Sequence, residues 1–91
     1  MHAIKLLIQG QVQGVGYRRW FEQQAIALDL KGYVKNLENG DVEAVVLGLD
    51  INIQAMYKLC YTGPARAKVA TVLQSEITLD EAKFTDFKIQ R

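Results

Sequence analysis

The spacing of apolar residues changes period several times along this chain, and this pattern constrains the fold more than any other feature. Residues 3–10 alternate in character, with every second side chain from Ile4 onward apolar, which predicts a largely buried strand. From about Arg18 to Leu28 the apolar spacing becomes that of a helix. The helix would bury one face, formed by Phe21, Ala25 and Leu28 with Trp20 beside them.

Residues 32–38 and 41–49 are typical of two strands, joined by Glu38-Asn39-Gly40-Asp41. Asn-Gly between strand-forming runs predicts a tight hairpin, because both central positions of a type I′ turn need a positive φ. We therefore expect a two-residue turn at the centre of this segment.

A second helix is expected to start after the hairpin, with Asp50 at its N-cap. Apolar residues then recur at helical spacing, and Gly63-Pro64 ends the helix. The buried stripe would consist of Ile53, Met56, Tyr57 and Cys60. Its position on this stripe makes Cys60 a small buried hydrophobe rather than a reactive nucleophile.

The C-terminal third predicts strands at residues 67–78 and 84–90, separated by a polar loop from Thr78 to Lys83. The resulting order is β-α-β-β-α-β, with a possible additional strand near the C-terminal end. This order indicates an α+β, ferredoxin-like split βαβ fold, with an antiparallel sheet of about five strands and two helices on one face.

Composition limits the classes of function. A chain of 91 residues with one proline predicts a single compact domain, and a net charge of +1 argues against nucleic-acid or membrane partners. A lone Cys60 cannot form an internal disulfide and no charged-then-apolar leader precedes the first strand, so we expect a cytoplasmic protein. A single His2 and scattered carboxylates favour no metal site.

The segment from Gly10 to Arg18, GQVQGVGYR, places three glycines and an arginine where the first strand runs into the first helix. Glycine allows close backbone approach to a ligand, a helix start offers unpaired N–H groups, and Arg18 offers a charged donor fork suited to phosphate. An ordinary strand–helix turn with Arg18 in solvent is the alternative. The glycine spacing does not match G-x-G-x-x-G or a Gly-Lys-Ser/Thr loop, which disfavours nucleotide binding.

The segment Gly32-Tyr33-Val34-Lys35-Asn36 places an amide on the same strand face as a core valine. An amide on such a face needs a hydrogen-bond partner or a function. The alternative is an asparagine that ends a strand and is satisfied by local backbone.

The chain resembles the acylphosphatase family over nearly its whole length, in the segments GQVQGVGYR, GYVKN, NGDVEAVVLG, TGPARAKV and FTDFKIQR. The first two segments are the specific ones. The resemblance implies that residues 1–91 form one acylphosphatase-like domain. The resemblance implies hydrolysis of the carboxyl-phosphate bond of small acyl phosphates to a carboxylate and inorganic phosphate, without metal or cofactor. It implies that phosphate is both product and inhibitor. We also expect a monomer.

The same resemblance implies two catalytic residues, Arg18 as the phosphate-binding arginine and Asn36 as the water-positioning asparagine. It implies that the phosphate is held by Arg18 and by the backbone amides of Gln13, Gly14, Val15, Gly16 and Tyr17. These roles are chemically reasonable, because an acyl phosphate already has a good leaving group and its hydrolysis depends mainly on positioning and charge stabilisation. No serine–histidine or cysteine–histidine pair is evident, which argues against a covalent phospho-enzyme.

The chain departs from the family pattern at a few positions. Asp29 stands where a glycine is usual after the first helix, and a left-handed conformation there would carry a small stability cost. Tyr33 and Tyr17 replace a more usual tryptophan and phenylalanine, and Arg19 is expected to face water with no role.

Two other functions are weighed against the enzyme: an anion-binding ferredoxin-like module without turnover, and an RNA-binding sheet. The second would need exposed sheet aromatics and a basic surround. An acylphosphatase-like module also heads larger carbamoyl-transfer proteins, but their cysteine-rich segments are not found in this sequence.

Overall fold

The computed structural model of this chain describes residues 1–78 and 83–90. Within these residues, five strands and two helices follow one another in the predicted β-α-β-β-α-β order, with a further strand at the end. They are β1 (His2–Gln11), α1 (Tyr17–Ala27), β2 (Lys31–Asn36), β3 (Val42–Gly48), α2 (Asp50–Thr62), β4 (Lys68–Glu76) and β5 (Phe87–Gln90). The predicted loop from Thr78 to Lys83 falls mostly on residues 79–82, which lie outside the described residues.

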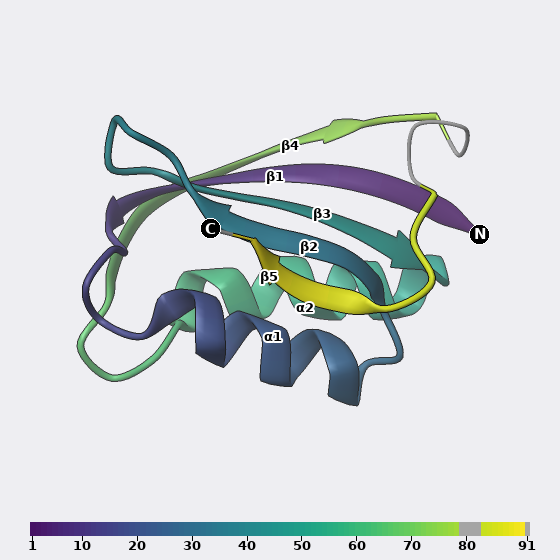
Figure 1. Cartoon of the computed structure of the whole chain (residues 1–91), viewed down its shortest axis with the longest axis horizontal. Helices are drawn as coiled ribbons and strands as arrows, with labels where there is room; N and C mark the ends of the chain where they lie inside the picture. The colour runs from purple at the N-terminus through teal and green to yellow at the C-terminus, as the bar shows by residue number, and fades with distance from the viewer. Residues whose placement is uncertain (79–82, 91) are drawn as a thin grey trace.

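The strands form one sheet in the order β4-β1-β3-β2-β5, and both helices cover the same face of it, as Figure 1 shows. This confirms the ferredoxin-like arrangement. The expectation of a purely antiparallel sheet is wrong at one edge, because β5 pairs with β2 in parallel. β4 and β5 lie at opposite edges of the sheet and run in opposite directions, because β4 is antiparallel to β1, β1 to β3 and β3 to β2.

The main core lies between the sheet and the helices, and the predicted alternation of side chains explains it. Fully buried side chains come from every second position of β1, from the middle of β2 and β3, and from the inner face of each helix. They include Leu6, Ile8, Val34, Val46, Phe21, Ala25, Ile53, Met56 and Cys60. The free Cys60 is buried, as predicted.

The helix-free face of the sheet carries a second and smaller apolar cluster. Ala3, Val45 and Leu47 are buried there, against the partly buried Tyr33, Ile77 and Phe84. Phe84 was expected to lie in the last strand, but β5 begins only at Phe87. The Phe84 ring instead packs against Tyr33, with ring centroids 5.6 Å apart.

The β2–β3 hairpin differs from the predicted type I′ turn. The N–H of Leu37 donates to the Asp41 carbonyl at 2.8 Å, and the N–H of Gly40 donates to the Leu37 carbonyl at 3.3 Å. Among the described turn residues Gly40 alone has a positive φ, 98°, which is the pattern of a three-residue loop with a type I turn and a G1 bulge. The Asn39 side chain accepts the Asp41 N–H at 3.0 Å, and this bond favours the observed turn.

The helix ends test two further predictions. Asp50 is the first residue of α2 rather than its cap: the N-cap is Leu49, and the Asp50 carboxylate makes no capping hydrogen bond. Its charge still lies at the positive end of the helix. Asp29, which follows the C-cap residue Leu28 of α1, has a φ of 56°, which confirms the left-handed conformation expected there.

Candidate functional site

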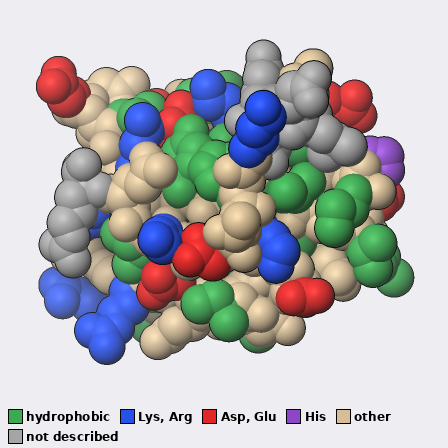
Figure 2. All heavy atoms as spheres, turned by 45° about the vertical axis from the view of Figure 1, so that its right-hand side comes forward, with side chains coloured by type: hydrophobic (Ala, Val, Ile, Leu, Met, Phe, Trp, Pro, Cys, Tyr) green, Lys and Arg blue, Asp and Glu red, His purple; other side chains and the backbone are tan. Residues whose placement is uncertain are grey.

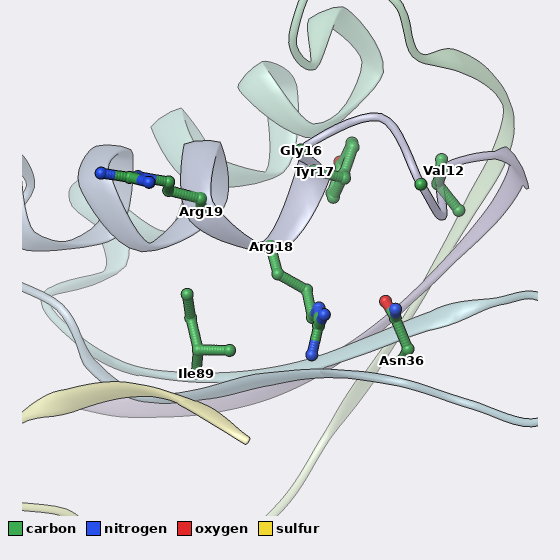
Figure 3. Close-up of a pocket in the computed structure, with 8 residues that line it drawn as sticks. Val12, Gly16, Tyr17, Arg18, Arg19, Asn36 and Ile89 are labelled. Carbon is green, nitrogen blue, oxygen red and sulfur yellow. The ribbon is translucent and has the colours of Figure 1, made fainter. Parts of the chain in front are cut away.

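A pocket of about 240 Å³ opens at the N-terminal end of α1, where the glycine-rich segment, the end of β2 and the end of β5 meet. Its lining residues come from all three of these segments. They are Val12, Gly14, Gly16, Tyr17, Arg18, Arg19, Asn36 and Ile89, most of which are labelled in Figure 3.

The loop between β1 and α1 presents backbone to this pocket. Gly14 and Gly16 both line it, and they have φ angles of 74° and 80°, which side-chain-bearing residues adopt only with strain. A Cβ atom at either position would meet nothing within 4 Å, so the space above both glycines is open. Val12 is buried in the main core and Val15 packs against this core, so these two side chains anchor the loop to the interior of the protein.

The start of α1 provides the positive end of a helix. Gly16 is the N-cap and makes no side-chain capping bond, and the first turn of the helix contains no acidic residue. Backbone N–H groups at such a terminus favour an anion, because they lack intrahelical partners and lie at the positive end of the helix dipole.

Arg18 extends from the first turn of α1 toward the ends of β2 and β5, as Figure 3 shows. Its Nη1 donates to the backbone carbonyl of Gln90 at 3.2 Å. Within residues 1–78 and 83–90, no carboxylate forms an ion pair with this guanidinium. The alternative of an arginine directed only into solvent is therefore wrong, since Arg18 is half-buried beside the pocket.

Asn36 is the last residue of β2 and lies on the same strand face as the buried Val34, as predicted. Its Oδ1 is buried, yet it accepts no hydrogen bond from any described residue. The alternative of an amide satisfied by local backbone therefore fails for this oxygen. A buried acceptor left without a donor costs about 1–3 kcal/mol, so its retention calls for an explanation.

The remaining predicted site residues are placed differently. Gln13 and Val15 do not line the pocket, and the Gln13 side chain donates instead to two carbonyls of the β2–β3 hairpin. Tyr17 is buried and donates its hydroxyl to the Cys60 carbonyl at 2.7 Å. Arg19 is exposed, and although it contributes to the pocket wall, its side chain points away from Arg18 and Asn36 in Figure 3.

Sequence reasoning missed two apolar members of the pocket wall, Val12 and Ile89. Val12 lies one residue beyond β1 and is buried, so its apolar side chain indicated a core position but not a place in the pocket wall. No local signal could place Ile89 here, because it reaches the pocket only through the pairing of β5 with β2, opposite Val34.

The electrostatics of the pocket are simple. Among the described residues that line it there is no Asp, Glu, His or Cys. Burial is the main cause that raises the pKa of Tyr17 far above its ordinary value, so its hydroxyl remains protonated. No cluster of His, Cys, Asp or Glu suited to a metal ion occurs in the described part of the chain. None of its helices has the length and apolarity to cross a membrane. The pocket can therefore bind an anion and orient a neutral molecule, but it offers no general base.

Comparison with known proteins agrees with this geometry. The family model described as Acylphosphatase matches residues 4–89. An acylphosphatase of Marinobacter nauticus is 43% identical over 83 residues, covering 91% of this chain and 89% of its own. Among solved structures, an acylphosphatase from Coxiella burnetii has a TM-score of 0.91 with 34% identity, covering 98% of this chain and 92% of that one. An acylphosphatase from Bacillus subtilis has a TM-score of 0.95 with 28% identity over the full length of both chains. This chain belongs to the acylphosphatase family of hydrolases.

Proposed function

We propose that the chain hydrolyses the carboxyl-phosphate bond of small acyl phosphates, with Arg18 and the backbone of residues 13–17 holding the phosphoryl group and Asn36 orienting the water. One observation carries the proposal: Asn36, whose buried Oδ1 accepts no hydrogen bond from any described residue, lines the same pocket as Arg18 and the glycine loop. A simple anion-binding site would need the arginine and the loop, but it would have no use for this amide oxygen.

The proposed reaction follows from these positions. Donors at the start of α1 and the Arg18 guanidinium bind the phosphoryl oxygens and stabilise the negative charge they carry in the transition state. The Oδ1 of Asn36 accepts a hydrogen bond from a water and holds its oxygen in line with the phosphorus. A bond forms between the water oxygen and phosphorus, the bond from phosphorus to the acyl oxygen breaks, and the carboxylate leaves with that electron pair. The released proton passes to the phosphate product or to solvent.

The described residues of the pocket wall offer neither a general acid nor a general base, which fits this chemistry. The carboxylate leaves without being protonated, and a loose transition state requires little deprotonation of the attacking water. The described residues of the wall include no Asp, Glu, His or Cys, and burial raises the pKa of Tyr17 above its ordinary value. We propose that inorganic phosphate, as product, occupies the same loop and competes with substrate.

The RNA-binding alternative is less well supported. Tyr33 and Phe84 lie on the helix-free face, but they pack against each other, and Glu43 lies beside them with Lys5 and Lys35. On the face drawn in Figure 2, acidic and basic side chains are intermixed. We propose a monomeric, cytoplasmic enzyme. The buried free Cys60 is compatible with a reducing compartment.

Hydrolysis of benzoyl phosphate in the presence of a metal chelator tests the proposal. The protein should release phosphate without added metal, and inorganic phosphate should inhibit competitively. Binding of phosphate without any turnover would instead identify an anion-binding module.

Substitution of Arg18 separates the proposed site from incidental activity. Arg18→Ala should lose phosphate binding and should lower kcat/KM on the order of a thousandfold, because the arginine binds the phosphoryl group in both ground and transition states. Lys58→Ala removes an equal charge from the exposed side of α2 and serves as the control. Unchanged phosphate affinity in Arg18→Ala would remove this residue from the site.

Substitution of Asn36 tests the role of the amide. Asn36→Ala should lower kcat about 100-fold while phosphate affinity changes little, because the water is oriented only for the reaction. Asn52→Ala, an amide substitution in the first turn of α2, is the matched control. A near-normal kcat in Asn36→Ala would contradict the mechanism.

A further inference from the structure

We infer that the side chain of Gln13 is a positioning residue for hydrolysis: it holds the phosphate loop and the end of β2 at a fixed separation, and so places Asn36 relative to the bound phosphoryl group. This inference rests on the proposed function. It is carried by two hydrogen bonds that cross from the loop to the hairpin, and it gives Gln13 a role distinct from backbone binding of phosphate.

The NH₂ group of the Gln13 side chain uses both of its hydrogens in hydrogen bonds. Its Nε2 lies 2.8 Å from the Leu37 carbonyl oxygen and 2.8 Å from the Asp41 carbonyl oxygen. Both partners are acceptors only, so the atom between them must be the NH₂ group, and each of its two hydrogens has one carbonyl. The side chain is half-buried, which makes such bonds stronger than they would be in open solvent.

The two acceptors are the carbonyls that close the hairpin. The Asp41 carbonyl also accepts the Leu37 N–H at 2.8 Å, and the Leu37 carbonyl also accepts the Gly40 N–H at 3.3 Å. Leu37 follows Asn36 directly in the chain. Gln13 therefore contacts the peptide segment immediately after the proposed water-orienting residue.

The sheet topology shows why such a tie is needed. β3 lies between β1 and β2, so the strand that leads into the loop and the strand that carries Asn36 do not pair with each other. The regular pairing of β1 with β3 ends at Ile8 and Val42, before the loop begins. Beyond that pair, the hydrogen bond from the Gln13 side chain to the Leu37 carbonyl connects the loop directly to the end of β2. Gln13 precedes Gly14 and Leu37 follows Asn36, and both Gly14 and Asn36 line the pocket.

The Asn36 side chain depends on this backbone placement, because its Oδ1 has no donor among the described residues to hold it. A small displacement of the hairpin would move the amide oxygen, and with it the water, away from the line of attack. Displacement by about 1 Å can reduce a rate by about 100-fold.

Gln13→Met tests the inference, because methionine retains most of the side-chain volume but has no donor. We expect kcat for benzoyl phosphate to fall about 10- to 100-fold, while the inhibition constant for inorganic phosphate changes by less than about threefold. Gln13→Glu should behave alike, since it places an oxygen against two carbonyl oxygens. Gln9→Met is the matched control: Gln9 also reaches the hairpin, through a longer 3.4 Å bond to the Asp41 carboxylate, and it lies outside the pocket wall.

A double-mutant cycle with Asn36→Ala distinguishes positioning from general loosening. If Gln13 acts through Asn36, Gln13→Met should lower kcat far less in the Asn36→Ala background than in the parent protein. Equal losses in both backgrounds, or a loss of phosphate affinity in proportion to kcat, would overturn the inference and leave the proposed function intact.

Amide hydrogen exchange gives a readout that does not depend on turnover. In Gln13→Met the Leu37 amide, which is bonded to Asp41, should exchange faster than in the parent, whereas amides in the middle of β1 should not change. Unchanged protection of Leu37 would overturn the inference even if the parent protein proved inactive. An inactive parent protein with faster Leu37 exchange in the variant would contradict the proposed function alone.

Discussion

Tyr17 combines two tasks that a phenylalanine at the same position would not. Its ring is fully buried beside Trp20 and Phe21 in the first turns of α1. Its hydroxyl donates to the carbonyl of Cys60, in the last turn of α2, at 2.7 Å. A helix leaves its last four carbonyls without intrahelical partners, so this bond satisfies one of them in the core. One side chain thus joins the start of α1, which borders the pocket, to the end of α2.

Tyr17→Phe is therefore expected to lower the free energy of unfolding by about 1 kcal/mol, because it leaves a buried carbonyl without its donor. Urea denaturation at neutral pH measures the change. Tyr57→Phe is the control, since among the described residues its hydroxyl bonds to that of Tyr61 alone, in an exposed pair. An equal effect of the two substitutions would show that the bond to Cys60 contributes nothing specific.

The C-terminal end of α1 shows how an element can tolerate an unfavoured residue. The N–H of Leu30 donates to the Ala25 carbonyl at 2.9 Å, and the N–H of Asp29 donates to the Ile26 carbonyl at 3.0 Å. These are the two bonds of a Schellman motif, and Leu30 and Ala25, at the positions where the motif favours apolar residues, are both buried. The motif requires a left-handed residue, and here that residue is aspartate rather than glycine.

Asp29→Gly should raise the free energy of unfolding by about 0.5 kcal/mol, because relief of the left-handed strain exceeds the greater flexibility of glycine in the unfolded chain. Asp29→Ala should have the opposite sign, since alanine keeps the strain and lacks the local polar interactions of aspartate. Denaturant titration of both variants decides the question. A loss of stability in Asp29→Gly would show that the aspartate side chain stabilises the motif.

At the scale of the whole molecule, the two faces of the sheet have separate roles. The helix-covered face holds the main core and the pocket, whereas the helix-free face carries a charged network over three strands. Glu43 on β3 pairs with Lys5 on β1 at 3.3 Å and with Lys35 on β2 at 3.5 Å, and it accepts the Tyr33 hydroxyl at 2.9 Å. One carboxylate thus links the three central strands at a distance from the pocket.

The pH dependence of stability should report this network. Burial acts to raise the pKa of Glu43, but the hydrogen bonds from Tyr33 and Lys5 and the two lysine charges outweigh it, so the pKa lies below its ordinary value of 4.5. A lowered pKa in the folded state means that the stabilisation is complete above the unfolded-state value and is lost as the pH falls through the folded-state value.

Glu43→Gln should therefore be less stable than the parent by about 1 kcal/mol at neutral pH, and the difference should shrink as the pH falls below 4.5. Thermal unfolding of both proteins from neutral to acidic pH measures it. A difference that stayed constant with pH would show that the charge of Glu43 does not contribute.

Much of the fold could be predicted because the relevant information is local. Period-two alternation in β1, helical spacing in α1 and α2, and Gly63-Pro64 after α2 depend on residues close together in the chain. The error in the hairpin occurred where two local patterns compete. Asn39-Gly40 fits a type I′ turn, but the Asn39 side chain accepts a hydrogen bond from the Asp41 N–H, and the hairpin forms a three-residue loop instead.

The residues proposed for the site could be named from sequence through the resemblance of GQVQGVGYR and GYVKN to the acylphosphatase family. The local patterns alone were insufficient, because glycine-rich turns and asparagines at strand ends are common. The function of the Gln13 side chain was not recognisable, since its partners Leu37 and Asp41 lie 24 and 28 residues away. Nothing in the neighbourhood of a glutamine indicates which distant carbonyls it will meet.

The sequence by itself determined the order of elements, the buried face of each and the conformational freedom of the glycine-rich loop, because these follow from side-chain size and backbone sterics at neighbouring positions. Only the tertiary structure decided that β5 lies parallel to β2, that Ile89 completes the pocket wall, and that Arg18 and Asn36 border one space. These features depend on how strands distant in the chain close into a single sheet, and such pairing is selected by the packing of the whole molecule.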